Sequence, residues 1–357
     1  MRPFSSRVKS TNHNRCSKII NHLSWVYTKR FICEENPGTP QGSKLSNFFF
    51  LMLVNSVVKV VKHSHITLFA DDMKIMHKIE SINDCHKLQS DLDSICCWAN
   101  ELGLKFNVQK CEQMTYSHKR NNISFNYTIN NSHLQIIDQK KDLGIKFTPN
   151  MSFNTHVENC ISSCNKILGL IKRSCKHMTD PDALLQLYQG LVRSKLEYGA
   201  VLWDPENNLW THKIEAVQYR FVKYLFHKEN GFYPVYPEHI SYLEMCEALQ
   251  LLTLRSRRKI QKMIHLYKLT KGSVDSFHLF VEMTKNILPM DLHHYSTRHS
   301  KKQYFKKSSS KYTSPLDKMC DEYNQHYNDE CNLSSPFQTF LKHLKDKFMS
   351  EQYTQGW

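Results

Sequence analysis

The chain has 357 residues, of which 48 are lysine or arginine and 33 are aspartate or glutamate, giving a formal net charge of +15. Apolar residues make up 40% and charged residues 23%, a composition that supports a packed core and argues against wholesale disorder. The longest unbroken apolar run, Phe48–Val54, has seven residues. A bilayer span needs ~20 residues, so we expect no membrane-spanning segment.

Charge and cysteine usage indicate the class of partner and the compartment. The positive excess favours a polyanion such as nucleic acid, with a solvated basic surface as the plain alternative. The 12 cysteines are scattered along the chain, so we expect a reduced, intracellular protein of the nucleus or cytoplasm. The first 33 residues contain seven basic residues and no acid. They lack an amphipathic arginine stripe, which argues against a mitochondrial transit peptide.

The first motif in chain order is a loop, Pro37–Ser43, that precedes the apolar run Phe48–Val54. Its glycines and prolines predict a turn. Such a loop can present backbone amides to a nucleotide phosphate or a template sugar. Taken alone, the loop would be a plain turn that leads into a core helix.

Two β-like runs come next, Ile66–Ala70 and Met73–His77, with Asp71 and Asp72 between them. This pattern predicts a hairpin with both carboxylates at its tip. Paired carboxylates suit Mg²⁺, which prefers oxygen ligands. An Asp-Asp pair by itself is more often a turn or a helix cap.

The next segment has helical periodicity and is expected to end at Gly103. Its apolar residues recur at steps of three and four: Leu88, Leu92, Ile95, Ala99 and Leu102. Short β-like segments come after it: Cys111–Ser117, Ile123–Ile129, Leu134–Ile137 and Leu143–Phe147. Asn130-Asn131 marks a tight turn, because asparagine tolerates a positive φ. Strands, a helix and further strands indicate an α+β fold.

Around Pro149 the pattern changes to helices. Six apolar residues at helical spacing predict one long amphipathic helix: Phe153, Val157, Ile161, Cys164, Leu168 and Ile171. Asp180-Pro181 is typical of an N-cap followed by the first helical residue. We expect this second helix to continue through Leu191 towards Gly199.

Three further features are weak signals. A candidate zinc set lies partly on the apolar side of the first helix, where cysteine as a small hydrophobe is favoured: Cys160, Cys164, Cys175 and His177. The basic run Arg255–Lys259 can meet phosphate, but a solvated helical face is commoner. The basic tail Leu292–Leu316 has aromatic residues among its cations: Tyr295, Tyr304, Phe305 and Tyr312. Nucleic-acid stacking and a mobile basic linker are equally supported there.

Four motifs in order and spacing resemble the reverse transcriptase of non-long-terminal-repeat retrotransposons, in particular LINE-type, jockey-like elements. They are Pro40-Gln41-Gly42, the aromatic-Ala-Asp-Asp run Phe69–Asp72, Trp98 near a helix end, and Asn107 with Lys110. The later segment LLQLYQGLVRSKLEYGAVLW resembles the thumb-side region of the same elements. The likeness runs from about residue 20 to near the carboxyl terminus.

The resemblance implies a fold and an activity. We expect a partial polymerase palm over residues 1–149, built as an antiparallel sheet with packed helices. An all-helical thumb-like region would follow over 150–290, then a basic tail and a C-terminal helix over 291–357. The implied activity is that of an RNA-directed DNA polymerase with a two-metal mechanism. It would use Mg²⁺ or Mn²⁺, an RNA template, a DNA primer and deoxynucleoside triphosphates.

The same resemblance implies site residues. Asp71 would be the principal metal ligand and catalytic carboxylate, with Asp72 as its neighbour. Five further residues are expected at the nucleotide or template: Gln41, Gly42, Phe69, Ala70 and Lys110. For Lys110, near the triphosphate, a solvent-exposed lysine is the plain alternative.

One departure from the family pattern bears on activity. The family has a third aspartate on a strand well upstream of the Pro-Gln-Gly loop, whereas this chain has no aspartate before Asp71. We therefore expect an amino-terminally truncated enzyme that is inactive alone, unless a complementing polymerase fragment supplies the strand. The alternatives are a non-catalytic nucleic-acid-binding relic and a helical interaction module on residues 150–290.

Overall fold

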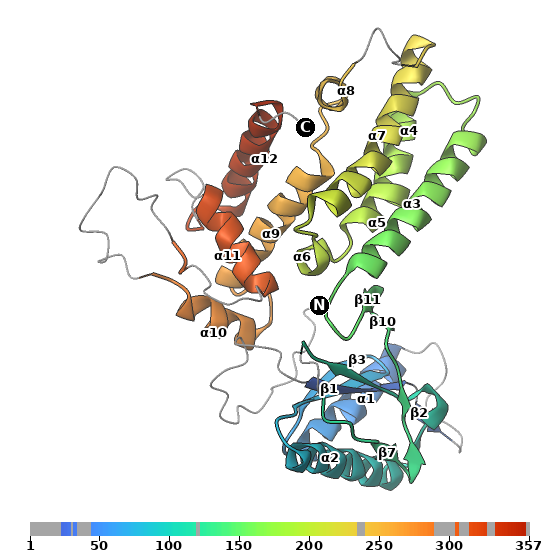
Figure 1. The fold of residues 1–357 in the computed structure, drawn as a ribbon, viewed down its shortest axis with the longest axis vertical. Helices are drawn as coiled ribbons and strands as arrows, with labels where there is room; N and C mark the ends of the chain where they lie inside the picture. The colour runs from blue at the N-terminus through green and yellow to red at the C-terminus, as the bar shows by residue number, and fades with distance from the viewer. Residues whose placement is uncertain are drawn as a thin grey trace. The chain divides into compact units, whose positions relative to one another are not determined.

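The structure is a computed structural model that describes residues 23–29, 31–33, 44–118, 122–233, 240–288, 304–306, 314–326 and 333–354. Contacts between Cα atoms divide the chain into two compact units, unit 1 (Met1–Ser152) and unit 2 (Phe153–Trp357), drawn in Figure 1. The expected mixed fold with a small, mainly antiparallel sheet is confirmed. The three-domain division stays a prediction.

Unit 1 contains a five-stranded sheet in the order β3-β4-β1-β6-β9. These strands are β1 (Leu23–Lys29), β3 (His65–Phe69), β4 (Asp72–Lys78), β6 (Glu112–Tyr116) and β9 (Gln135–Ile136). Only the β6–β9 pair is parallel among the described strands. Three short ladders join β2 (Phe31–Cys33) to β5 (Leu104–Phe106), β7 (Thr128–Ile129) to β8 (Ser132–His133), and β10 (Lys140–Asp142) to β11 (Ile145–Phe147).

The helix α2 (Ile82–Glu101) supplies most of the core of unit 1. A capping box of Ser81 and Asp84 starts the helix, with the Asp84 carboxylate accepting the Ser81 backbone N–H at 3.0 Å. The predicted apolar face packs against the sheet, and the fully buried residues include Val26, Met73, Ile75, Leu88, Leu92, Ile95 and Ala99. Gly103 ends the helix at φ +68°, as predicted. The prediction is wrong for Leu102, which lies past the last turn and is 38% exposed.

A buried carboxylate on α2 positions the chain that enters β3. Asp91 is 1% exposed and accepts the backbone N–H groups of Lys62 at 2.9 Å and Ser64 at 2.7 Å. It also accepts the N–H of His63 at 3.0 Å. Several donors on one buried carboxylate fix a loop firmly. The strand that leads to Asp71 therefore starts from a rigid point.

The helix α1 (Lys44–Asn55) leaves most of its apolar residues on the surface. Its exposed large side chains are Leu45, Phe48, Phe49, Leu51, Met52 and Leu53, whereas Val54 is buried. A short 3₁₀ helix, η1 (Ser56–Lys59), comes after it and buries Val57. The sequence alone leaves a core helix over Phe48–Val54 as one alternative. Within the described residues, α1 is not a core helix, because most of its apolar side chains are exposed.

The predicted strand Ile123–Ile129 is shorter than expected. Only Thr128–Ile129 forms a strand, because the side chain of Gln113 takes hydrogen bonds that a neighbouring strand would otherwise make. Its amide donates to the Phe125 carbonyl at 3.0 Å, and its carbonyl oxygen accepts the Tyr127 N–H at 3.1 Å. The turn prediction is confirmed, since Asn130 and Asn131 both have positive φ, +48° and +61°.

Unit 2 is helical in nearly all its described residues (Figure 1). Its first group of helices is α3 (Asn154–Ser174), α4 (Pro181–Tyr188), the π-helix η3 (Gln189–Arg193), α5 (Ser194–Glu197), α6 (Ala200–Trp203), α7 (Asn208–Asn230) and α8 (Tyr242–Ala248). The second group is α9 (Leu254–Thr270), α10 (Phe277–Lys285), α11 (Pro315–His326) and α12 (Phe337–Thr354). No helix among the described residues is long and apolar enough to cross a membrane.

The predicted N-cap of α4 is confirmed, since the Asp180 carboxylate accepts the Asp182 N–H at 2.9 Å. The second helix continues through Leu191 towards Gly199 as expected, by way of η3 and α5, but Leu191 itself is 48% exposed while its neighbour Val192 is fully buried. The cause is η3, in which the wider turn holds one extra residue. That residue rotates the next helical turn by about 100° around the helix axis.

Most of the basic tail Leu292–Leu316 lies outside the described residues. Phe305, one of its aromatic residues, is fully buried, with its ring 5.7 Å from that of Tyr323. It forms an isolated bridge with Ile287. The expectation of base stacking is therefore wrong for Phe305, which is a core residue of unit 2.

Candidate active site

The hairpin of β3 and β4 carries the two predicted carboxylates, and the hairpin prediction is confirmed. Phe69 pairs with Asp72, so that Ala70 and Asp71 form a two-residue loop. Ala70 adopts φ +52°. A left-handed conformation costs an alanine on the order of 1 kcal/mol, and strain of this kind collects at functional sites.

Asp71 is exposed and Asp72 is half-buried. Neither carboxylate forms an ion pair with another residue that the structure describes. Their hard oxygen donors fit a cation such as Mg²⁺. Over the same residues, no three histidine, cysteine, aspartate or glutamate side chains lie together as a metal site. A metal at this hairpin would therefore need water or nucleotide phosphate oxygens to complete its ligands.

A cluster of paired charges lies on the same face of the sheet as Asp72. Lys74, two residues along β4, shares that face because alternate residues of a strand point the same way. Its ammonium lies 2.5 Å from the Asp142 carboxylate, and both side chains are nearly buried. Lys140 in the same way pairs with Glu112. The carboxylates of Asp142 and Glu112 are thus already neutralised.

Two buried tyrosines complete this cluster. The hydroxyl groups of Tyr27 and Tyr116 lie 2.9 Å apart, and the Lys140 ammonium lies 5.0 Å from the centre of the Tyr27 ring. Burial raises the pKa of Tyr116 to about 12, so both rings stay neutral hydrogen-bonding groups. The sequence pattern did not indicate this cluster, because its members come from four strands, β1, β4, β6 and β10.

The other predicted site residues divide into two groups. Gln41 and Gly42 lie outside the described residues. Phe69 is 60% exposed, and Ala70 and Lys110 are also exposed. Lys110 ends the short 3₁₀ helix η2 (Val108–Lys110), just before β6.

The strand registers place Lys110 relative to the carboxylates. On β1, Lys29 pairs with Asp72, and Tyr27 pairs with Glu112. Lys110, two residues before Glu112, therefore lies at the same end of the sheet as Asp72. Two inter-strand spacings, about 10 Å, separate the strands concerned.

Residues 6–148 match the family model described as reverse transcriptase (RNA-dependent DNA polymerase). This match supports a reverse transcriptase. It lies within unit 1 and contains the Asp71–Asp72 hairpin. Reverse transcriptases act on a nucleic-acid template with nucleotide substrates and generally use divalent metals. No curated protein matches the chain.

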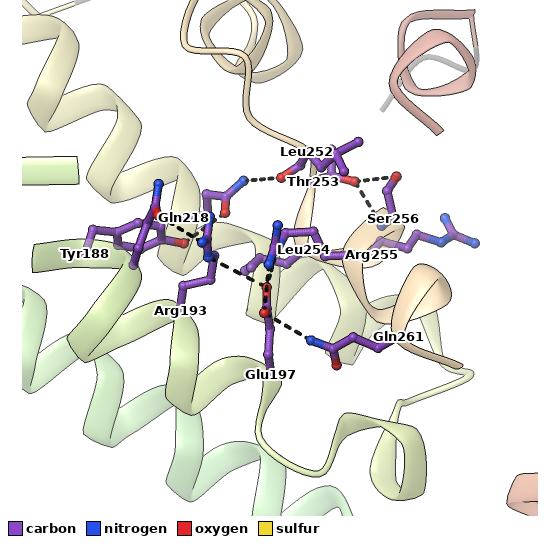
Figure 2. A network of polar contacts seen from close by, with 12 residues as sticks. Tyr188, Arg193, Glu197, Gln218, Leu252, Thr253, Leu254, Arg255, Ser256 and Gln261 are labelled. Carbon is purple, nitrogen blue, oxygen red and sulfur yellow. Dashed lines mark hydrogen bonds and ion pairs between the residues drawn. The ribbon is translucent and has the colours of Figure 1, made fainter. Parts of the chain in front are cut away.

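Unit 2 holds a separate polar network, part of which is drawn in Figure 2. The Glu215 carboxylate, 1% exposed, accepts the Tyr242 hydroxyl at 2.8 Å and the Leu254 N–H at 3.1 Å. It also accepts the N–H of Arg255. Burial raises the pKa of Glu215 against the opposing charge of Arg258. A side chain of α7 thus caps the amino terminus of α9, where the helix dipole favours a carboxylate.

Most side chains of the basic run Arg255–Lys259 form ion pairs with acidic residues of unit 2. Arg257 pairs with Glu197. Glu197 also accepts the Gln261 amide at 3.0 Å, a contact drawn in Figure 2. Two further pairs are Arg258 with Asp204 at 2.6 Å and Lys259 with Glu322 at 3.0 Å. The expectation of a solvated basic face is therefore wrong for these three residues. Their partners are far away in the sequence, so no local pattern could reveal them.

Proposed function

We propose that this chain is an RNA-directed DNA polymerase of a LINE-type, jockey-like mobile element, with Asp71 and Asp72 as its metal ligands. The family match over residues 6–148 supports the polymerase class. The observation that carries the site assignment is the two-residue hairpin loop, which holds the Asp71 and Asp72 carboxylates at its tip without ion-pair partners among the described residues.

Each predicted residue would have a defined part in template-directed nucleotide addition. Bound divalent ions would activate the primer 3′-hydroxyl and stabilise the leaving oxygen. Asp71 and Asp72 would hold and orient those ions. Lys110 would neutralise charge on the triphosphate. The contacts to template and nucleotide would come from Gln41, Gly42, Phe69 and Ala70. Catalysis of this type consists mainly of positioning and charge neutralisation.

We further propose that the chain alone has little or no activity. Two carboxylates give a two-ion site less charge and one bridging ligand fewer than three would. The neighbouring acids Glu112 and Asp142 are held by Lys140 and Lys74 and cannot substitute without breaking buried ion pairs. A complementing polymerase fragment that carries a further aspartate would restore the site.

Primer extension on an RNA template with Mg²⁺ or Mn²⁺ tests this function. Any incorporation should require template and metal, and should be lost in Asp71→Asn. Asp138→Asn removes an exposed carboxylate elsewhere in unit 1 and is the matched control. Measurable, template-dependent incorporation at the same rate by the wild type and Asp71→Asn would refute the proposed site.

A second candidate is a non-catalytic nucleic-acid-binding protein. It is favoured by the net charge of +15 together with the lack of a three-carboxylate group among the described residues. This function predicts nucleic-acid binding that neither EDTA nor Asp71→Asn changes. Binding that depends on the metal and on Asp71 would favour the polymerase instead.

A further inference from the structure

The helices α3 and α7 lie side by side in unit 2 (Figure 1) and together carry an excess of positive charge. The cations on or just after these helices are Lys166, Lys172, Arg173, Lys176, Lys213, Arg220, Lys223 and Lys228. The acids there are Glu158 and Glu229, which are exposed, and Glu215, which is buried. Across the described part of the chain, none of the eight cations forms an ion pair.

Neutral oxygens, rather than acids, hold several of these cations in place. The Arg220 guanidinium donates to the Asn165 side-chain oxygen at 2.9 Å, and Lys172 donates to the Arg220 carbonyl at 3.2 Å. Lys228 donates to the Lys176 carbonyl. Burial, with the charge of Arg220, lowers the pKa of Lys172. Several of the positive charges therefore lie close together along the α3–α7 pair, where an approaching anion would relieve their repulsion.

An aromatic ring lines a hollow between the two helices. A hollow of about 540 Å³ is lined by Glu158, Ile161, Ser162, Asn165, Lys166, Trp210 and Lys213. The Lys213 ammonium lies 4.2 Å from the centre of the half-buried Trp210 ring. A partly exposed indole next to cations that form no ion pairs is the combination that stacks a base and neutralises the adjoining phosphates.

We propose that this α3–α7 face, defined by the eight cations and Trp210, binds single-stranded nucleic acid. A base would stack on Trp210, and phosphates would follow the cations along the two helices. From residue 158 to the end of α3 at residue 174 this face is about 24 Å long at ~1.5 Å per helical residue. The inference rests on the proposed function only for the choice of nucleic acid among polyanions. It requires neither Asp71 nor a metal.

The test is fluorescence anisotropy of the full chain with a labelled, mixed-sequence single-stranded RNA, in EDTA and without nucleotide, over a range of KCl. Lys166→Gln/Lys213→Gln should bind about tenfold or more weakly at low salt. Its slope of log affinity against log salt should be smaller by about 1.4, at ~0.7 per lost phosphate contact. The matched control is Lys342→Gln/Lys345→Gln, two exposed lysines of α12, which should bind like the wild type.

Trp210 tests the stacking part of the proposal. Trp210→Ala should weaken binding about fivefold or more with an unchanged salt slope, and Trp210→Phe should restore it. Circular dichroism of each variant is the control for folding. The proposal would be overturned if both lysine double variants weakened binding equally, or if Trp210→Ala had no effect. It would also be overturned if the chain bound double-stranded RNA of the same sequence as tightly as the single strand, or bound no RNA. Asp71→Asn should bind RNA as tightly as the wild type. A failure of the α3–α7 proposal can therefore be distinguished from a failure of the proposed polymerase site.

Discussion

The candidate metal ligands stand beside an alanine in a conformation that suits glycine better. Ala70 has φ +52° in the loop that presents Asp71. We expect Ala70→Gly to raise the free energy of unfolding of unit 1 by about 0.5–1 kcal/mol, because relief of Cβ strain exceeds the added flexibility of the unfolded chain. Urea unfolding measures this change. A clear loss of stability would show that the loop is not left-handed at this position.

Glu322 makes the stability of unit 2 depend on pH. Burial by itself would raise the pKa of Glu322, but the hydrogen bond from His326 and the charge of Lys259 outweigh it and lower the pKa to about 2. A lowered carboxylate pKa adds stability that is complete above the ordinary value, near 4.5. That stability is lost as the pH falls towards 2.

We therefore expect Glu322→Gln to destabilise unit 2 by roughly 2–3 kcal/mol at pH 7 and by only about a quarter of that near pH 2.5. Denaturant unfolding of both proteins across this pH range measures the difference. The same difference at both pH values would show that the Glu322 charge contributes nothing.

Among the elements, the π-helix η3 determines which side chains of its segment reach the core. It leaves Leu191 48% exposed and buries Val192 completely. We expect Val192→Ala to cost about 1–3 kcal/mol of unfolding free energy. Leu191→Ser should change it by no more than about 0.5 kcal/mol. The opposite order in thermal or urea unfolding would mean that a regular α-helix runs through these residues.

The elements that the sequence predicts well are those set by near neighbours. The β3–β4 hairpin, the Asp180 cap and the end of α2 at Gly103 each depend on a few adjacent residues. The wrong expectations concern distant contacts. Gln113 replaces strand bonds around Tyr127, and nothing local shows this.

The same distinction holds for the candidate site. The local sequence pattern predicts that Asp71 and Asp72 lie at the tip of a hairpin. The ion pair of Lys74 with Asp142 can be seen only in the folded structure, where β10 lies close to the sheet. Sequence reasoning therefore could not show that the nearby acids of the described sheet are already paired.

At the scale of the whole molecule, each unit has a core of its own. The core of unit 1 centres on α2 and the sheet, and a core of unit 2 centres on α9, α11 and α12. We expect a fragment of residues 153–357 to keep its helicity and to unfold cooperatively, because the Glu215 and Glu197 networks lie wholly inside it. Circular dichroism during heating measures this. A fragment without a cooperative transition would show that unit 2 needs unit 1.

The proposed polymerase site is tested most directly by Mn²⁺ binding, which does not require an active enzyme. Electron paramagnetic resonance titration of the wild type, Asp71→Asn and Asp138→Asn measures bound metal without template or primer. We predict that Asp71→Asn weakens Mn²⁺ binding by roughly tenfold or more, while Asp138→Asn leaves it unchanged. Equal Mn²⁺ affinity in all three proteins would contradict the assignment of the hairpin carboxylates as metal ligands.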